Sequence, residues 1–387
     1  MSADASEKTA NYLELEGLRG WMAFWVFVTH VTTMATLPLE KGSGWGRLLA
    51  DGSIAVGTFI MISGFVIALS LHRRPTPDDF FIRRALRIFP VYLVGLFLSV
   101  LVLDLSIDFL QNMPWDAPRR LDRLAYLQDS ADNFWLHLAL HIPLLHGLVP
   151  ESLLPSTSYA FMGQGWSLTL EWQFYLVAPL LYAAVRARGA LVHLGVFAGL
   201  VVLSQYLRQG SFLPSYLWLF YVGILFQLVV SATEPRQRAM LLAVCAAAFV
   251  VALWRRQPAV SYLLFFLALG SAAGMLPSWG ARVVKAVLCN RFSTWLGHVS
   301  YAFYCIHMVA IFVTAWFIVD VLGVSSRPLY AVSLIVGSLA IALAVSHLLG
   351  KWVEQPCIRL GKRIVAARAA RRRAGMQEQS LMEGVRS

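Results

Sequence analysis

Charged residues are scarce in this sequence. Only 14% of its 387 residues are Asp, Glu, Lys or Arg, and 58% are hydrophobic, with a mean hydropathy of +0.64. Soluble domains carry about 25% charged residues because their surfaces face water. The composition therefore excludes an ordinary soluble domain and predicts an integral membrane protein, and the many aromatic side chains suit two membrane interfaces.

Cysteine is scarce as well, and it lacks a metal-binding pattern. Cys245, Cys289, Cys305 and Cys357 show no paired metal-type spacing, so we interpret them as inert buried thiols and predict no metal site. We also predict no cleavable signal peptide. The first residues are polar and no small-residue cleavage site follows the first apolar run, which we interpret as the first span.

Long apolar runs, by contrast, are frequent. Ten of them are long enough to cross a bilayer, and they predict an all-α membrane protein with about ten transmembrane helices. With the N-terminus in the cytoplasm, 23 of the 32 lysines and arginines fall on the cytoplasmic side, so both termini are predicted to be cytoplasmic. The runs lie near residues 21–38, 52–71, 88–108, 166–185, 189–205, 214–231, 239–254, 258–277, 295–320 and 329–350.

The spans form one membrane domain with a tail at each end. Residues 1–14 are interpreted as a cytoplasmic tail, residues 15–352 as the membrane domain, and residues 353–387 as a basic cytoplasmic tail. The one long connection, residues 109–165, is predicted to be extracytoplasmic and to carry short helices, because apolar and polar residues alternate there at helical spacing. We attribute the basic tail and the net charge of +11 to contact with anionic lipid and not with nucleic acid.

The stretch Leu15–His30, reading LEGLRGWMAFWVFVTH, places a cation and an imidazole on one helix. Arg19 and His30 are eleven steps apart, and at about 100° per residue both side chains lie on one helix face. With a rise of about 1.5 Å per residue they stand roughly 16 Å apart, about half the thickness of a bilayer core. A cation near one membrane surface and a titratable group far below it suggest the two ends of a path.

Two further titratable residues are expected at the depth of His30. Counted from the predicted span ends, Glu171 and His307 enter from opposite sides and reach the same outer half of the membrane. An imidazole near a carboxylate and a second imidazole can act as a general base toward a hydroxyl. The alternative for each residue alone is a polar core residue whose hydrogen bonds are satisfied.

Arginines mark the opposite, inner side. Arg84 and Arg87 in FIRRALRIFPVYL are three residues apart and share a helix face, and clustered guanidinium groups suit phosphate. Ordinary anchoring of a span by positive residues is an equally good interpretation. Ser63 fits a helix contact better than a nucleophile. Asp104 is compatible with orienting a histidine, with binding a sugar and with an interfacial position.

Six segments of the sequence together resemble acyltransferase family 3, a family of multi-pass membrane O-acyltransferases. The resemblance covers about residues 12–360, and the segments follow one another in the family's order. Trp172 stands where many members carry a second acidic residue. The segments are LEGLRGWMAFWVFVTH, FIMISGFVI, RRALRIFPVYL, WSLTLEWQFYLVAPLL, SYAFYCIHMVAIF and VEQPCIRL.

The resemblance implies transfer of an acyl group, usually acetyl, from cytoplasmic acyl-coenzyme A to a hydroxyl of an extracytoplasmic or lipid-linked carbohydrate or other glycosylated acceptor. It implies His30 as the catalytic base, with Arg19 and Glu171 as its catalytic partners. Residues in the matching segments and at the outer end of the third span are assigned to the two substrates. For the donor these are Arg19, Arg84, Arg87, Ser63 and Tyr92; for the acceptor they are Trp166, Ser167, Gln173, Tyr175, His307 and Asp104.

The expected partners are acyl-coenzyme A, with acetyl-coenzyme A as the first candidate, a glycosylated acceptor and membrane lipid; no metal and no nucleic acid are expected. The resemblance places the protein in the bacterial cytoplasmic (inner) membrane as a multi-pass protein. A homo-oligomer is compatible with the sequence, which leaves the oligomeric state open. A transporter or flippase of a glycolipid, without acyl-coenzyme A chemistry, is the main alternative. A non-catalytic membrane scaffold is the second alternative, but it leaves the intramembrane histidines unexplained.

Overall fold

The chain folds into a bundle of helices. The computed structural model describes residues 12–37, 39, 44–73, 75–207, 209–255 and 257–386, and within these ranges it contains helices and no strand. The all-α prediction is therefore confirmed for the described residues. The predicted tail over residues 1–14 lies almost entirely outside them.

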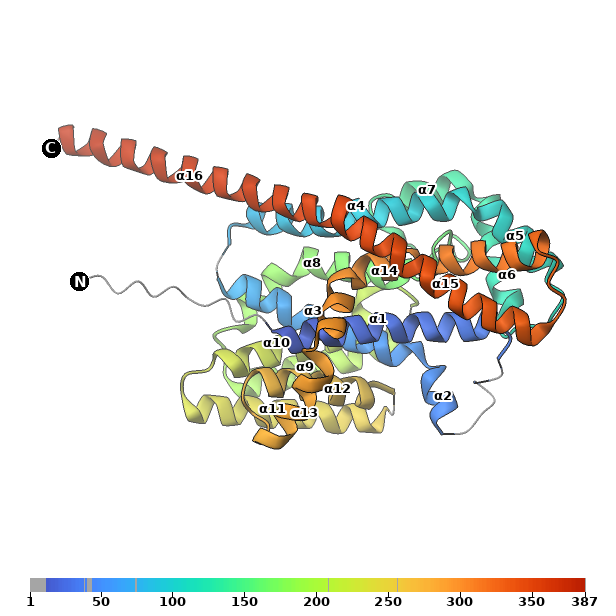
Figure 1. Ribbon diagram of the computed structural model, residues 1–387. Helices are drawn as coiled ribbons and strands as arrows, with labels where there is room; N and C mark the ends of the chain where they lie inside the picture. The colour runs from blue at the N-terminus through green and yellow to red at the C-terminus, as the bar shows by residue number, and fades with distance from the viewer. Residues whose placement is uncertain are drawn as a thin grey trace.

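Helices follow one another along the whole described chain (Figure 1). Most are joined by short turns, and two π-helical turns, Phe317–Val321 and Gly350–Glu354, continue α14 and α15. The α-helices are α1 (Leu13–Met34), α2 (Trp45–Leu49), α3 (Gly52–His72), α4 (Pro77–Leu101), α5 (Leu103–Asn112), α6 (Arg120–Asp132), α7 (Phe134–His141), α8 (Gly165–Val185), α9 (Ala190–Tyr206), α10 (Leu217–Ser231), α11 (Pro235–Trp254), α12 (Gln257–Ala272), α13 (Ser278–Leu288), α14 (Arg291–Trp316), α15 (Arg327–Leu349) and α16 (Gln355–Arg386).

Among the described residues, six helical stretches are long and apolar enough to cross a membrane. Each of the ten runs predicted from the sequence overlaps a helix, but the third does so differently from the prediction. The helix of this run, α4, begins at Pro77, after the cap residue Thr76, and is separated from α5 by a break at Val102. The six stretches are Gly52–His72, Pro77–Leu101, Gly165–Val185, Pro235–Trp254, Arg291–Val321 and Arg327–Ala374; Ala190–Tyr206, Leu217–Ser231 and Ala259–Ala272 are shorter apolar helices.

Helix α1 is not among the six, because its polar residues lower its hydropathy, yet it lies in the middle of the bundle. It packs against α14, α3 and α12, which cover much of its surface. Glycines make the contact with α14 close: a Cβ on Gly20 would come within 2.6 Å of the Gly297 nitrogen, and one on Gly297 within 2.2 Å of the Glu16 oxygen. Small residues at such crossings let helix backbones touch inside a membrane protein.

The long connection between α4 and α8 is folded and contains α5, α6 and α7. Arg120 fixes the start of α6, because its guanidinium donates hydrogen bonds to three carbonyl oxygens near the end of α5: Leu110 at 2.8 Å, Gln111 at 3.1 Å and Met113 at 3.3 Å. Arg119, directly before α6, has a left-handed φ of 58°. This geometry holds the first turn of α6 over the end of α1 that carries His30.

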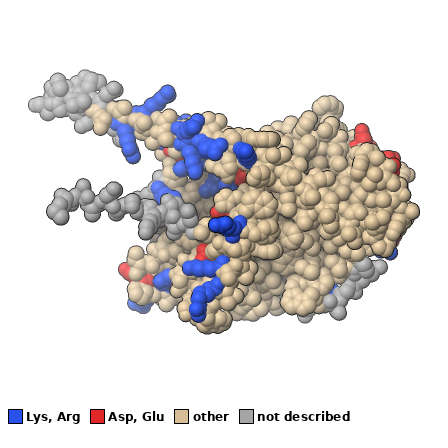
Figure 2. Space-filling model, in the orientation of Figure 1, with Lys and Arg blue, Asp and Glu red and all other residues tan. Residues whose placement is uncertain are grey.

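The last helix, α16, projects beyond one end of the bundle. Figure 1 shows α16 extending past the other helices on the side where α1 begins. Arg368 and Arg372 of α16 pair with Asp78 and Asp79, in the first turn of α4. On the face shown in Figure 2, Lys and Arg gather at this same end of the molecule.

Candidate active site

Two cavities meet inside the bundle. We call the first the histidine cavity; it has a volume of about 550 Å³, and the residues that define it are His30, Arg119, Asp122, Arg123, Tyr126, Tyr159, Gln164 and Trp166. We call the second the arginine cavity; it has a volume of about 370 Å³ and is defined by Arg19, Ser63, Arg84, Arg87, Ser167, Glu171 and Tyr175. Val56 and Tyr304 line both cavities, so they form the shared wall.

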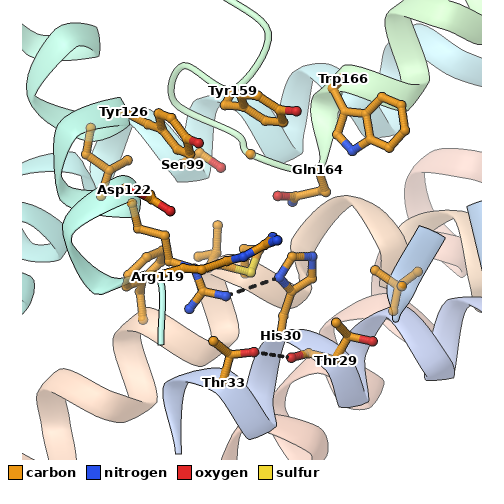
Figure 3. Close-up of a pocket in the computed structure, with 18 of the residues that line it drawn as sticks. Thr29, His30, Thr33, Ser99, Arg119, Asp122, Tyr126, Tyr159, Gln164 and Trp166 are labelled. Carbon is orange, nitrogen blue, oxygen red and sulfur yellow. Dashed lines mark hydrogen bonds between the residues drawn. The ribbon is translucent and has the colours of Figure 1, made fainter. Parts of the chain in front are cut away.

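His30 projects from α1 into the histidine cavity (Figure 3), and groups from two distant segments lie close to its ring. On one side, a guanidinium nitrogen of Arg123 lies 3.4 Å from its Nδ1 atom. On the other side, the ring of His307 lies with its centroid 5.3 Å from that of His30. Sequence reasoning expected His307 near His30, and the structure brings these two residues together.

His307 is buried behind His30 and does not line either cavity. Its Nδ1 atom lies 2.8 Å from the carbonyl oxygen of Tyr304, and a carbonyl only accepts, so Nδ1 carries the proton. The lone pair of neutral His307 is therefore on Nε2, and this atom makes no hydrogen bond to any described residue. His307 thus lies beside His30 but outside the lining of both cavities.

Aromatic side chains form the wall of the histidine cavity opposite His30. Figure 3 shows Tyr126 and Asp122 on the side of α6, and Gln164 and Trp166 at the start of α8. The rings of Tyr126 and Tyr159 are stacked, with centroids 5.0 Å apart. Flat aromatic faces beside polar groups suit an amphipathic ligand such as a sugar ring.

The arginine cavity collects three guanidinium groups. Arg19 comes from α1, and Arg84 and Arg87 come from α4, one helical turn apart. The Arg84 guanidinium lies over the Tyr175 ring, 5.6 Å from its centroid, and at 5.7 Å from that of Phe80. Three planar cations in a small cavity form a good site for an anion that carries several phosphate oxygens.

Glu171 lies in the arginine cavity and not beside the two histidines, which differs from the expected common depth. Its Oε1 atom accepts hydrogen bonds from Ser63 at 2.9 Å and from Tyr175 at 2.5 Å. Trp166 on the same helix lines the histidine cavity, and five residues along α8 carry Glu171 about 7.5 Å further along the axis. Depth counted from span ends has an error of this size, so sequence alone did not resolve the difference.

The shared wall is built around the phenol of Tyr304. Its hydroxyl lies 2.7 Å from the Ser167 hydroxyl and donates to the Gln164 carbonyl oxygen at 3.2 Å. The Gln164 side-chain amide in turn donates to the Cys305 carbonyl oxygen at 2.8 Å. These bonds connect α8 to α14 at the point where one cavity ends and the other begins.

Besides His307, three other residues assigned to the substrates from the sequence line neither cavity. Tyr92 is fully buried and donates to the His141 carbonyl oxygen at 2.8 Å. Gln173 binds backbone groups of Ser211 and Leu213, and Asp104 is exposed at the start of α5. The structure thus places these three outside the group formed by the other assigned residues.

Sequence reasoning missed the residues of α6 and its N-terminus. Arg119 directly precedes α6 and Arg123 lies in its first turn, and both line the histidine cavity. Basic residues in a segment expected on the outer side are unusual under the positive-inside rule. These basic residues on the predicted outer side were the signal that could have identified α6 as part of the histidine cavity.

A second group of histidines lies outside both cavities, in and after α7. His137, His141 and His146 are buried, and the rings of His141 and His146 are stacked with centroids 3.9 Å apart. Burial lowers the pKa of His141 to about 4 and that of His137 below its ordinary value. Across the described residues, no cluster of three or more His, Cys, Asp or Glu is arranged to hold a metal ion.

Comparison with known proteins gives a family match and two relatives. The model of a family described as an acyltransferase domain matches residues 12–347. The chain is 28% identical over 395 residues to acyltransferase MdmB of Streptomyces mycarofaciens, covering 92% of this chain and 94% of that protein. It is 27% identical over 226 residues to nodulation protein 10 of Rhizobium leguminosarum bv. viciae, covering 54% and 58%. No solved structure matches the chain.

Proposed function

Because this chain belongs to the acyltransferase family that matches residues 12–347, we propose that it moves an acyl group from acyl-coenzyme A to a hydroxyl of a glycosylated acceptor. Acetyl is the proposed acyl group, and the acceptor is an extracytoplasmic or lipid-linked carbohydrate or another glycosylated molecule. The relatives support an acyltransferase. The identity of the two substrates is our proposal.

One observation carries the proposal: a cavity with three arginines and a cavity with a histidine share a wall inside the bundle. A phosphate-bearing donor and a hydroxyl-bearing acceptor need two sites that meet at one point, one with cations for phosphate and one with a base for the hydroxyl. Arg19 and His30 on the same face of α1 connect the two sites, with one residue in each cavity. This arrangement supports acyl transfer between two substrates that enter from different sides.

The arginine cavity suits the donor. Guanidinium groups of Arg19, Arg84 and Arg87 would bind the phosphates of coenzyme A, each as a planar donor of several hydrogen bonds. Glu171 is held by Ser63 and Tyr175, so its negative charge balances part of the positive charge of the arginines when no donor is bound. We assign Glu171 this electrostatic role.

His30 acts as the general base toward the acceptor. It takes the proton of the acceptor hydroxyl while the hydroxyl oxygen attacks the thioester carbonyl carbon. The carbon–sulfur bond then breaks, the thiolate takes the proton from the imidazolium, and an ester and free coenzyme A result. Tyr304 and Val56 at the shared wall lie where the acyl group would pass between the cavities.

The membrane orientation is part of the proposal. We propose that the end of the molecule where Lys and Arg gather in Figure 2 faces the cytoplasm, in the bacterial inner membrane. The donor then enters from the cytoplasm and the acceptor from the opposite side.

Labelled acetyl-coenzyme A and purified protein in lipid nanodiscs test the function. The wild type should bind the donor and release coenzyme A slowly, and His30→Ala should lower this release at least about a hundredfold, the usual share of a general base. His347→Ala, an exposed histidine at the end of α15, is the matched control and should behave as wild type. Retained release by His30→Ala would contradict the mechanism, and absent binding by the wild type would favour a carrier.

A further inference from the structure

Arg123 covers one nitrogen of His30. A terminal guanidinium nitrogen of Arg123 lies 3.4 Å from the Nδ1 atom of His30, and the dashed line to the His30 ring in Figure 3 marks this contact. A guanidinium group donates hydrogen bonds and never accepts them. Nδ1 of His30 is therefore the acceptor in this pair and carries the lone pair.

The position of the lone pair decides where His30 can act as a base. A neutral imidazole carries one proton, so with Nδ1 as acceptor the proton sits on Nε2. A base takes a proton only through a nitrogen that holds a lone pair. In this structure that nitrogen is Nδ1, and it faces Arg123 rather than open space in the histidine cavity.

The contact between Arg123 and His30 is longer than an average hydrogen bond. Hydrogen bonds between nitrogen and nitrogen or oxygen are usually about 2.7–3.2 Å long, so a contact of 3.4 Å is weaker than average. Arg123 belongs to α6, whose start is tied to the end of α5 by Arg120, so the backbone beneath Arg123 is fixed. Uncovering Nδ1 therefore requires a rotation of the long Arg123 side chain and no movement of α6.

We propose that Arg123 shields the basic nitrogen of His30 until an acceptor hydroxyl replaces the guanidinium, so that Arg123 selects the acceptor over water. The proposal rests on the proposed function of this same site. Arg123 is a positioning residue in this scheme, because it acts through His30.

The reaction that Arg123 suppresses is hydrolysis of the donor. Without the shield, His30 takes a proton from water while the water oxygen attacks the thioester carbonyl carbon. The carbon–sulfur bond breaks, the thiolate leaves with the proton from the imidazolium, and acetate and free coenzyme A result. An acceptor that replaces Arg123 brings its own hydroxyl to Nδ1 and excludes water from that position.

Chemical modification measures the shield without any need for activity. Diethyl pyrocarbonate reacts with imidazole through its lone pair, and mass spectrometry of the protein in nanodiscs gives the rate at His30. Arg123→Ala should raise this rate about two- to tenfold, the factor that corresponds to the net free energy of one hydrogen bond. Arg123→Lys keeps a cationic donor and should stay close to wild type.

Arg119→Ala is the matched control for charge. Arg119 lines the same cavity and carries the same charge, but its substitution leaves the Arg123 contact with Nδ1 in place. The His30 modification rate should not rise in this variant. An equal rise in Arg119→Ala and Arg123→Ala would overturn the proposal, because loss of charge alone would then explain both.

Release of coenzyme A from acetyl-coenzyme A without acceptor is the second measurement. Arg123→Ala should raise release about two- to tenfold over wild type, and Arg123→Ala combined with His30→Ala should abolish it. His30-dependent release that does not rise in Arg123→Ala would overturn this proposal alone. Release that never depends on His30 would instead overturn the proposed function, and the modification rates would still report on the shield.

Discussion

His30 shows how much of a site can be predicted from residue spacing. Its place on one face of the first helix with Arg19 follows from helical geometry, and each of the two residues lines one cavity. His307 was expected nearby and is 5.3 Å away between ring centroids. These placements could be predicted because helix periodicity is a local property of an apolar run.

Glu171 and Arg123 show where residue-level reasoning ends. Glu171 lies about one and a half helical turns along α8 from Trp166, and that offset moves it from one cavity to the other. Arg123 reaches His30 from a segment 93 positions away. Tertiary packing decides which turn of a folded loop lies over a given span. The spacing of residues within the loop does not predict that contact.

Buried histidines near α7 make stability depend on pH. Burial lowers the pKa of His141 in the folded protein to about 4, whereas the ordinary value is 6.5. The folded state therefore binds fewer protons than the unfolded state in this interval. The stabilisation by neutral His141 is complete above pH 6.5 and is lost as the pH falls toward 4, by about 1.4 kcal/mol per pH unit at most. We expect the Tm in nanodiscs to fall steeply over this interval.

The variant His141→Gln separates this effect from general acid denaturation. A glutamine cannot titrate, so the fall in Tm between pH 6.5 and pH 4 should be shallower in His141→Gln than in the wild type. His347→Ala, which removes an exposed histidine, should keep the wild-type slope. Identical slopes in His141→Gln and wild type would show that His141 does not cause the pH dependence.

At the scale of elements, the crossing of α1 and α14 decides whether His30 and His307 meet. Gly20 and Gly297 allow the two backbones to touch, since a Cβ on Gly20 would lie 2.6 Å from the Gly297 nitrogen. Gly20→Ala must push the helices apart, and overpacking of this kind costs about 1–3 kcal/mol. We expect a lower Tm and a loss of His30-dependent release of coenzyme A.

Gly199→Ala on α9 is the matched substitution. No heavy atom lies within 4 Å of the position that its Cβ would take, and alanine favours a helix over glycine by about 0.5–1 kcal/mol. This variant should keep or slightly raise the Tm, with activity unchanged. Equal Tm values for Gly20→Ala and Gly199→Ala would mean that the α1–α14 contact is not tight.

The sequence predicted which segments form helices better than it predicted where those helices begin, end or break. All ten predicted apolar runs overlap helices, because hydropathy and helix length are properties of the run itself. The start of α4 at Pro77 and its break at Val102 were missed. The first turn of α4 is polar, and it is helical because Thr76 caps it. A prediction from hydropathy alone therefore places the start of this helix too late in the sequence.

For the whole molecule, the two cavities and the uneven charge predict a sided reaction. Inside-out membrane vesicles expose the cytoplasmic face, so added acetyl-coenzyme A should be consumed by them and not by right-side-out vesicles. Coenzyme A is too polar to cross a bilayer unaided. Right-side-out vesicles made permeable with detergent are the control and should regain activity. Equal consumption by both sealed orientations would contradict the proposed orientation.

The wall at Tyr304 and Val56 has a consequence for the cell as a whole. If the proposed transfer operates, a compartment outside the cytoplasm needs no pool of activated thioesters of its own, because acyl groups reach it through this wall. The nucleotide carrier then stays on the side where it is made and recharged. On this view only the acyl group crosses the wall and its carrier does not, and the hydrogen bonds that hold Tyr304 to Ser167 and Gln164 limit how large a group can pass.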